Sequence, residues 1–329
     1  MSQRNSLLPL SIAALIIASF SAFLSGCNKA VAGEKSNPVI SPKPVETTST
    51  PKPKLEEAPE FDGQKAFDIL KKQCDFGPRP VGSEAHKRTQ EYLVEQMKKY
   101  ADKTVEQTFT YKGLPLCNVI GEFNPNASRK VLLCAHWDTR PRAEMELDDV
   151  NKKKPIIGAS DGASGVAVLL ELARNFKEKK PTIGVVIVLL DGEDYGSFDT
   201  MQGVLLGAEY FARHHENYKL EYGVLLDMVG DADLDIYREV NSENYAPGTN
   251  RKIFTIAKEL GFGDHIIDKV NTNVIDDHIP LNKARIPTVD LIDFDYKYWH
   301  TLDDTPEHCS AKSLEMVGKT ISQLIYRER

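Results

Sequence analysis

The chain has 329 residues, of which 41% are hydrophobic and 27% are charged, and its formal net charge at pH 7 is −7. This composition is typical of a globular protein with a sizeable core. The acidic balance, with no stripe of basic residues, excludes nucleic acid as the main partner.

Residues 1–27 predict a targeting segment rather than part of the fold. An apolar run from Leu10 to Leu24 is followed by small residues, and it is too short for a stable membrane span. Residues 24–27, with the sequence LSGC, resemble the lipobox of bacterial lipoproteins, which implies that Cys27 is lipidated and becomes the mature N-terminus. We therefore expect an exported lipoprotein that is held to a membrane by its lipid alone and faces the periplasm or the cell exterior. An ordinary signal peptide with an incidental cysteine is the alternative.

Residues 28–60 are rich in Pro, Lys, Ser and Thr and contain almost no large apolar side chains. Such a segment cannot bury enough apolar surface to offset the entropy lost on ordering, so we expect a disordered tether. The tether precedes one catalytic domain, predicted over residues 61–329, which is long enough for a large α/β domain. We expect this domain to be a monomer.

Four cysteines lie within the predicted domain: Cys74, Cys117, Cys134 and Cys309. Export permits disulfide bonds. Cys117 and Cys134 flank a segment that predicts a β-hairpin, across which the two thiols could face each other. A disulfide between them and two buried free thiols both remain open at this point.

The predicted helices and strands alternate along the domain. Residues 61–100 carry apolar residues at spacings of three and four, which predicts helices interrupted by the turn GPRPVGS. Short apolar runs then predict strands that are buried on both faces, at 131–138, 184–194, 222–231 and 286–295. Helical patterns separate these strands at 164–179, 205–217 and 250–261. The alternation predicts a three-layer α/β/α sandwich with a mostly parallel, mixed central sheet.

The four predicted strands all end in, or lead directly to, acidic residues or histidine. The carboxyl ends of parallel strands meet at one edge of a sheet, and open α/β folds place their sites at that edge. One Asp after a strand usually forms a turn, but four such endings indicate an active site. Asp161 joins the set from GASDGASG before a predicted helix, where helix capping is its alternative role. The candidates are His136, Asp161, Glu193, Asp194, Asp227 and His300.

Two imidazoles with several carboxylates form a donor set that zinc accepts while keeping a position open for substrate. Magnesium or calcium would favour oxygen ligands and leave the histidines unexplained. Glu193 and Asp194 are adjacent at a strand end, so their side chains diverge. Asp194 can then bind a metal ion while Glu193 faces the substrate as an acid or base.

The motifs GPRPVGS, AHWD, GASDGASG, DGED, LLDMVGD, DDHIP and WHTLDD resemble, in this order, those of the M28 family of zinc-dependent aminopeptidases and glutaminyl cyclases. The resemblance spans residues 61–329 and implies a phosphorylase/hydrolase-like form of the predicted fold. In the aminopeptidase branch Glu193 is the general base, and two zinc ions are held by the matching positions His136, Asp161, Asp194, Asp227 and His300.

In the cyclase branch the resemblance implies a single zinc ion, held by Asp161, Asp194 and His300. Glu193 then moves protons as general acid and base. Asp227 and Asp276 join its hydrogen-bond network, so the implied catalytic residues are Glu193, Asp227 and Asp276.

Two departures from the aminopeptidases indicate the cyclase branch. Asp276-Asp277-His278 stands where they usually carry Ser-Asp-His, and Trp299-His300 stands where they carry Tyr-His. The resemblance then implies a glutaminyl-peptide cyclotransferase. Such an enzyme converts the N-terminal Gln of peptides and proteins to pyroglutamate and releases ammonia.

The resemblance also implies a substrate pocket for the glutamine side chain. Trp299 is expected to form one wall and Ile275 to border it. The animal cyclases have a second pocket Trp that is absent from this chain, so Phe198 or Tyr195 is expected to replace it. Asp194 stands where the animal cyclases carry Glu.

Three alternatives stay open. A two-zinc aminopeptidase on the same fold is one, because His136 and Asp227 offer a second metal site. A non-catalytic binding lipoprotein is another, although the complete set of acid and ligand residues argues against it. The third concerns Arg140 and Arg142, which follow the first site strand and could bind a peptide carboxylate or pair with Glu144.

Overall fold

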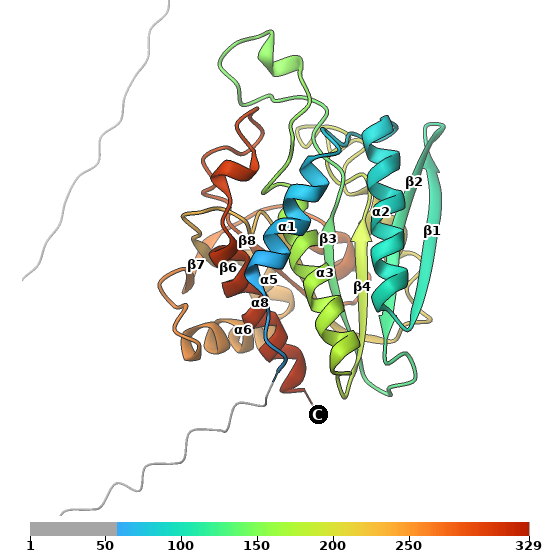
Figure 1. The fold of residues 1–329 in the computed structure, drawn as a ribbon, viewed down its shortest axis with the longest axis vertical. Helices are drawn as coiled ribbons and strands as arrows, with labels where there is room; N and C mark the ends of the chain where they lie inside the picture. Colours follow the sequence, from blue (N-terminus) through green and yellow to red (C-terminus); the bar gives the residue numbers. More distant parts are fainter. Residues whose placement is uncertain (1–57, 329) are drawn as a thin grey trace, which may run out of the picture. The chain divides into compact units, whose positions relative to one another are not determined.

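The computed structural model describes residues 58–328 (Figure 1). The predicted targeting segment, including Cys27, and the predicted tether up to residue 57 lie outside the described residues. Between residues 58 and 328, none of the helices is both long and apolar enough to cross a membrane.

The centre of the fold is a six-stranded sheet with the strand order β1-β2-β4-β3-β5-β8. β2 pairs antiparallel with β1 and β4, whereas β4, β3, β5 and β8 run parallel to one another. In the parallel part, Leu133 pairs with Ile187 on one side and Val224 on the other. The strands are β1 (Lys103–Tyr111), β2 (Leu114–Phe123), β3 (Lys130–His136), β4 (Gly184–Leu190), β5 (Leu220–Asp227) and β8 (Thr288–Ile292).

Helices cover both faces of this sheet, and α1, α2 and α3 lie side by side over one of them in Figure 1. That face packs against α1 (Gly63–Cys74), α2 (Glu84–Tyr100), α3 (Ala163–Glu178), α6 (Pro247–Glu259) and α8 (Ala311–Tyr326). The other face packs against α4 (Leu206–Ala212) and α7 (His278–Lys283). Alternate residues of β3 enter the two cores, so Leu133 contributes to the first and Leu132 to the second. The predicted α/β/α sandwich is confirmed.

Most of the remaining elements lie in the C-terminal half of the chain. A two-stranded parallel sheet is formed by β6 (Ile236–Glu239) and β7 (Ile266–Thr272). α5 (Val240–Tyr245) begins where the Glu239 carboxylate accepts hydrogen bonds from the first free N–H groups of the helix. Two short 3₁₀ helices complete the described elements, η1 (Asn151–Lys153) and η2 (Pro306–His308).

The predicted hairpin between Cys117 and Cys134 is wrong. β2 and β3, which contain the two cysteines, are not neighbours, because β4 pairs with both and lies between them. The four described cysteines are free and buried. The thiols of Cys117 and Cys134 are therefore on separate strands of the core, and no disulfide joins them.

Candidate active site

The carboxyl ends of the parallel strands gather titratable side chains at one edge of the sheet, as the sequence predicted. These side chains come from β3 and β5, from the segments that follow β4 and β8, and from the loop before α3. They are His136, Asp161, Glu193, Asp194, Asp227 and His300. All six are buried.

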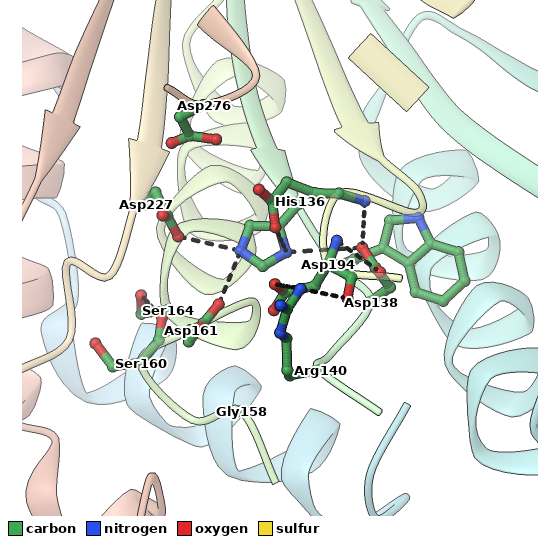
Figure 2. A network of polar contacts seen from close by, with 12 residues as sticks. His136, Asp138, Arg140, Gly158, Ser160, Asp161, Ser164, Asp194, Asp227 and Asp276 are labelled. Carbon is green, nitrogen blue, oxygen red and sulfur yellow. Dashed lines mark hydrogen bonds and ion pairs between the residues drawn. The ribbon is translucent and has the colours of Figure 1, made fainter. Parts of the chain in front are cut away.

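His136, at the end of β3, lies between two carboxylates (Figure 2). Its Nε2 atom is 3.1 Å from Asp227 Oδ1 and 3.2 Å from Asp161 Oδ1. Burial lowers the pKa of His136, but Asp138, Asp161 and Asp227 together outweigh burial and raise that pKa well above its usual value. His136, Asp161 and Asp227 are close enough together to hold one metal ion.

Asp161, Asp194 and His300 form a second group of potential metal ligands. His300 Nε2 is 3.5 Å from Asp161 Oδ2 and 3.6 Å from Asp194 Oδ1. Asp194 Oδ2 is buried and has no hydrogen-bond partner among the described residues. A buried carboxylate oxygen without a donor is unfavourable unless a cation binds it. One imidazole nitrogen and two carboxylates that converge in this way fit a zinc ion.

Two carboxylates to which the sequence assigned no role hold the backbone of the ligand-bearing loops. Asp138 accepts hydrogen bonds from the backbone N–H groups of Glu193 (3.0 Å) and Asp194 (3.2 Å). Asp304 accepts from the backbone N–H of Asp161 (3.2 Å) and of the residue before it (2.8 Å). The signal for both was their position in AHWD and WHTLDD, shortly after a histidine that could bind a metal ion, where an Asp also resembles an ordinary turn former.

The loop that carries Asp161 depends on the glycine after it. Gly162 has a φ of +106°, a conformation that side chains with a Cβ rarely adopt. A Cβ atom at this position would lie 2.6 Å from the backbone oxygen of Asp138. The glycine therefore lets the Asp161 loop approach the β3 loop closely enough for the two groups of ligands to share Asp161.

Glu193 and Asp276 are buried acids whose pKa values are raised. Burial, with the nearby Asp194 carboxylate, raises the pKa of Glu193 well above its usual value. Burial, followed by the Asp227 carboxylate, raises the pKa of Asp276 to about 7. Asp276 Oδ1 accepts a hydrogen bond from the backbone N–H of Asp277 (2.5 Å), and its Oδ2 has no partner among the described residues. A raised pKa favours the protonated form of each carboxyl group, which is the form that can donate a proton.

A cavity of about 290 Å³ opens onto these groups. Glu193, Asp227 and Asp276 line it together with the second ligand group. Of the predicted pocket residues, Phe198, Ile275 and Trp299 line the cavity. The sequence did not indicate the other apolar wall residues, which are Met201, Met228, Val274, Ile292 and Phe294.

Tyr195 does not line the cavity. Its ring packs edge-on against Tyr111 of β1, with 6.1 Å between the ring centroids, in a small cluster over β2. Of the two aromatic residues expected at this position of the pocket, Phe198 lines the cavity and Tyr195 does not. Arg140 does not line the cavity either, because its guanidinium pairs with Glu144 and Asp194.

Comparison with known protein families identifies the family of this chain. Residues 118–325 match peptidase family M28. The chain belongs to this family. The match includes both groups of potential metal ligands, and it confirms the resemblance that the motifs carried.

The proteins that this chain resembles have two kinds of name. A glutaminyl cyclase from Tannerella forsythia is 40% identical, with a TM-score of 0.78 over 82% of this chain and 100% of that chain. A leucine aminopeptidase precursor from Bacteroides thetaiotaomicron is 37% identical, with a TM-score of 0.79 over 83% of this chain and 99% of that one. A glutaminyl-peptide cyclotransferase from Drosophila melanogaster is 27% identical over 69% of this chain and 70% of its own length.

Proposed function

We propose that the chain is a glutaminyl-peptide cyclotransferase that closes the N-terminal Gln of peptides and proteins into pyroglutamate and releases ammonia. The observation that carries the proposal is that Glu193, Asp276 and Trp299 line one cavity together with a single group of zinc ligands. The relatives from Tannerella forsythia and Drosophila melanogaster, which bear cyclase names, support it.

In this proposal one zinc ion is held by Asp161, Asp194 and His300, whose donor atoms lie within 4.8 Å of one another. Bound there, zinc supplies Lewis-acid polarisation of the γ-carbonyl of the substrate glutamine and stabilises its developing negative charge. The protein's part is to hold the three ligands in place and to orient the substrate over them.

In this proposal the main role of the cavity is to orient the substrate glutamine. The nucleophile and the electrophile, the α-amine and the γ-carboxamide, belong to the same glutamine residue, so ring closure needs a folded side chain more than capture of a second molecule. Trp299 and Phe198 offer aromatic walls for the methylene groups of that side chain. Trp299 also stacks on His300, with 4.1 Å between the ring centroids, so the wall and a zinc ligand support each other.

Glu193 is the group that moves protons in the proposed reaction. Its carboxylate takes a proton from the attacking α-amine, and its acid form then gives a proton to the leaving ammonia, so the residue is unchanged after each turnover. The raised pKa favours the acid form of Glu193, which suits the second step because the leaving ammonia needs a proton. Asp276 and Asp227 line the same cavity. In this proposal they keep the transferred proton near Glu193.

A two-zinc aminopeptidase is the second candidate function, and one observation favours it. His136, Asp161 and Asp227 form a further group of potential ligands that shares Asp161 with the first. In that reaction an activated water attacks the first peptide bond and a free amino acid is released. The two candidates therefore differ in metal content, in the use of water and in product.

The proposal includes export and a lipid anchor at Cys27, for which the support is the LSGC sequence after the apolar run. The catalytic domain is proposed to be held at the membrane by this lipid and to act as a monomer on peptides outside the cytoplasm.

An ammonia assay with matched peptides tests the proposed function. Peptides that differ only in their first residue, Gln, Asn or Ala, are incubated with the zinc-loaded protein, and ammonia and free amino acids are both quantified. We expect ammonia from the Gln peptide alone, since Asn is one methylene too short to form the five-membered ring. Release of the first residue from the Ala peptide at a comparable rate would instead favour the aminopeptidase.

A further inference from the structure

The segment after β3 reaches two of the proposed zinc ligands from outside the cavity. Residues 140–146, with the sequence RPRAEME, contact Asp194 and His300, yet Arg140 and Glu144 do not line the cavity. These contacts leave the substrate side of the site free, so their role concerns the ligands themselves.

Glu144 faces the ring nitrogen of His300 that points away from the other ligands. Glu144 Oε1 is 3.5 Å from His300 Nδ1, whereas His300 Nε2 faces Asp161 and Asp194. A carboxylate on the Nδ1 side favours the tautomer in which Nδ1 carries the proton and Nε2 keeps its lone pair for a metal ion. Arg140 holds this carboxylate with two hydrogen bonds of 2.7 and 2.5 Å.

Arg140 also holds the ligand carboxylate of Asp194. Its Nη1 donates to the backbone oxygen of Asp194 at 3.0 Å and to Asp194 Oδ1 at 3.3 Å (Figure 2). Arg140 is 3% exposed, and its guanidinium lies over the Phe198 ring, 5.4 Å from the ring centroid. Contacts with Glu144, Asp194 and Phe198 fix the planar guanidinium, so its donors keep one geometry. They orient Asp194 so that its Oδ2 has no hydrogen-bond partner between residues 58 and 328.

The same segment fixes the backbone around His300. The N–H of Met145 donates to the carbonyl oxygen of His300 at 3.2 Å, and Glu146 Oε1 accepts from the N–H of Leu302 at 2.9 Å. His300 has a φ of +54°, the left-handed conformation that costs free energy for a residue with a Cβ. These bonds to His300 and to the residue two positions after it hold the strained residue in the conformation that turns its ring towards Asp161 and Asp194.

We propose that Arg140 and Glu144 are positioning residues that orient His300 and Asp194 for zinc. The inference deepens the proposed function because it rests on the proposed zinc site, and it applies equally to the cyclase and the aminopeptidase. It also decides the role that the sequence left open for Arg140, which serves the metal ligands and does not bind a peptide carboxylate.

Zinc affinity, measured by competition with a chromophoric chelator, tests the inference without a substrate. Glu144→Gln keeps the size of the side chain but removes the charge, and we expect it to weaken zinc binding by about 10- to 100-fold. Arg140→Gln should weaken zinc binding by a similar factor. The matched control is Arg142→Gln, because Arg142 belongs to the same segment but donates to the Gly196 carbonyl oxygen and contacts neither ligand. Its zinc affinity should equal that of the wild type.

A second readout separates positioning from a general loss of structure. The melting temperature of the metal-free Glu144→Gln protein should stay within a few degrees of the metal-free wild type, while the absorption spectrum of the cobalt-substituted variant changes. Unchanged zinc affinity in Glu144→Gln overturns the inference, and so does an equal loss in Arg142→Gln. If the wild type binds no zinc, the inference and the proposed site both fail. If it binds zinc but yields no ammonia from a Gln peptide, the proposed function fails alone.

Discussion

Burial decides the proton chemistry of single residues at this site. Glu193 is 6% exposed and has several carboxylates nearby, so its charged form is disfavoured and its pKa rises. An ordinary surface Glu would stay ionised near neutral pH. It would therefore rarely carry a proton that it could give to the leaving ammonia. Burial of this side chain after the end of β4 therefore suits it to the proposed role of proton carrier.

Glu193→Gln tests this role directly. The amide keeps the shape of the side chain but cannot exchange the proton, so we expect kcat to fall by about 10²- to 10⁴-fold with little change in KM. Zinc content should stay at the wild-type level, because Glu193 is not among the three proposed ligands. A variant with normal turnover would contradict the proposed mechanism, and steady-state ammonia release is the measurement.

Asp293 offers a pH prediction away from the metal ligands. It follows β8, is 1% exposed and accepts hydrogen bonds from the N–H groups of Asp235 and Asp295. Burial raises its pKa to about 7, well above the value of an unfolded chain. Between these two values the folded state binds more protons than the unfolded state, so the free energy of unfolding decreases as pH rises through this range.

Asp293→Asn removes this titration. Relative to the variant, the wild type should lose about 2 kcal/mol of unfolding free energy between pH 5 and pH 8. Urea denaturation of both zinc-loaded proteins at the two pH values gives the comparison. A wild type that gains stability relative to the variant as pH rises would show that the carboxyl is not buried in its neutral form.

At the residue scale the sequence predicted the chemistry better than the supporting contacts. His136, Asp161 and Asp194 were recognisable because they stand at strand ends or before a helix. Tyr195 was assigned to the pocket because it follows Asp194, yet the turn after Asp194 directs its ring towards Tyr111. The direction of a side chain in an irregular turn depends on backbone angles that no periodicity reports.

At the scale of helices and strands, the site depends on how closely α3 packs on the sheet. α3 follows Asp161 directly, and Gly165 in its first turn lies against β3 and β5. A Cβ at Gly165 would clash with the backbone oxygen of Leu226 and would lie 2.9 Å from the Cβ of Ala135. Glycine at this position therefore allows the helix to approach the strands that carry His136 and Asp227.

Gly165→Ala should separate α3 from the sheet and lower the free energy of unfolding by about 1 to 3 kcal/mol. Because Asp161 moves with the helix, zinc affinity should also fall. Gly248→Ala in α6 is the control, since nothing lies within 4 Å of a Cβ there, and it should be neutral or slightly stabilising. Thermal unfolding of both variants measures the contrast, and equal stability of the two would contradict the close-packing argument.

Strand order was the part of the sheet that the sequence could not predict. The four parallel strands were found because they are continuous apolar runs. The position of β4 between β2 and β3 depends on pairings such as Ile120 with Val188, which are distant along the chain and leave no local pattern. The same absence of local signal explains why the expected hairpin between Cys117 and Cys134 was wrong.

At the scale of the whole molecule, the proposed anchor sets where the reaction takes place. Cys27→Ser should abolish incorporation of a labelled fatty acid and release the protein from the membrane fraction, because a serine cannot accept the thioether-linked lipid. The activity of the released protein on a Gln peptide should match that of the wild type. Equal labelling of the variant and the wild type would exclude Cys27 as the lipid site.

The proposed chemistry predicts that no water is consumed. Glutaminyl cyclisation joins two atoms of one residue and expels ammonia, whereas an aminopeptidase must add the oxygen of water to the residue that it releases. The distinction holds whether one or both groups of ligands bind zinc, because it follows from the product and not from the metal content.

The most direct measurement is therefore mass spectrometry of a Gln-initiated peptide incubated with the zinc-loaded protein in heavy-oxygen water. We expect a peptide of full length that has lost one ammonia and carries no heavy oxygen. A peptide shortened by one residue, together with free glutamine that contains heavy oxygen, would contradict it and identify an aminopeptidase.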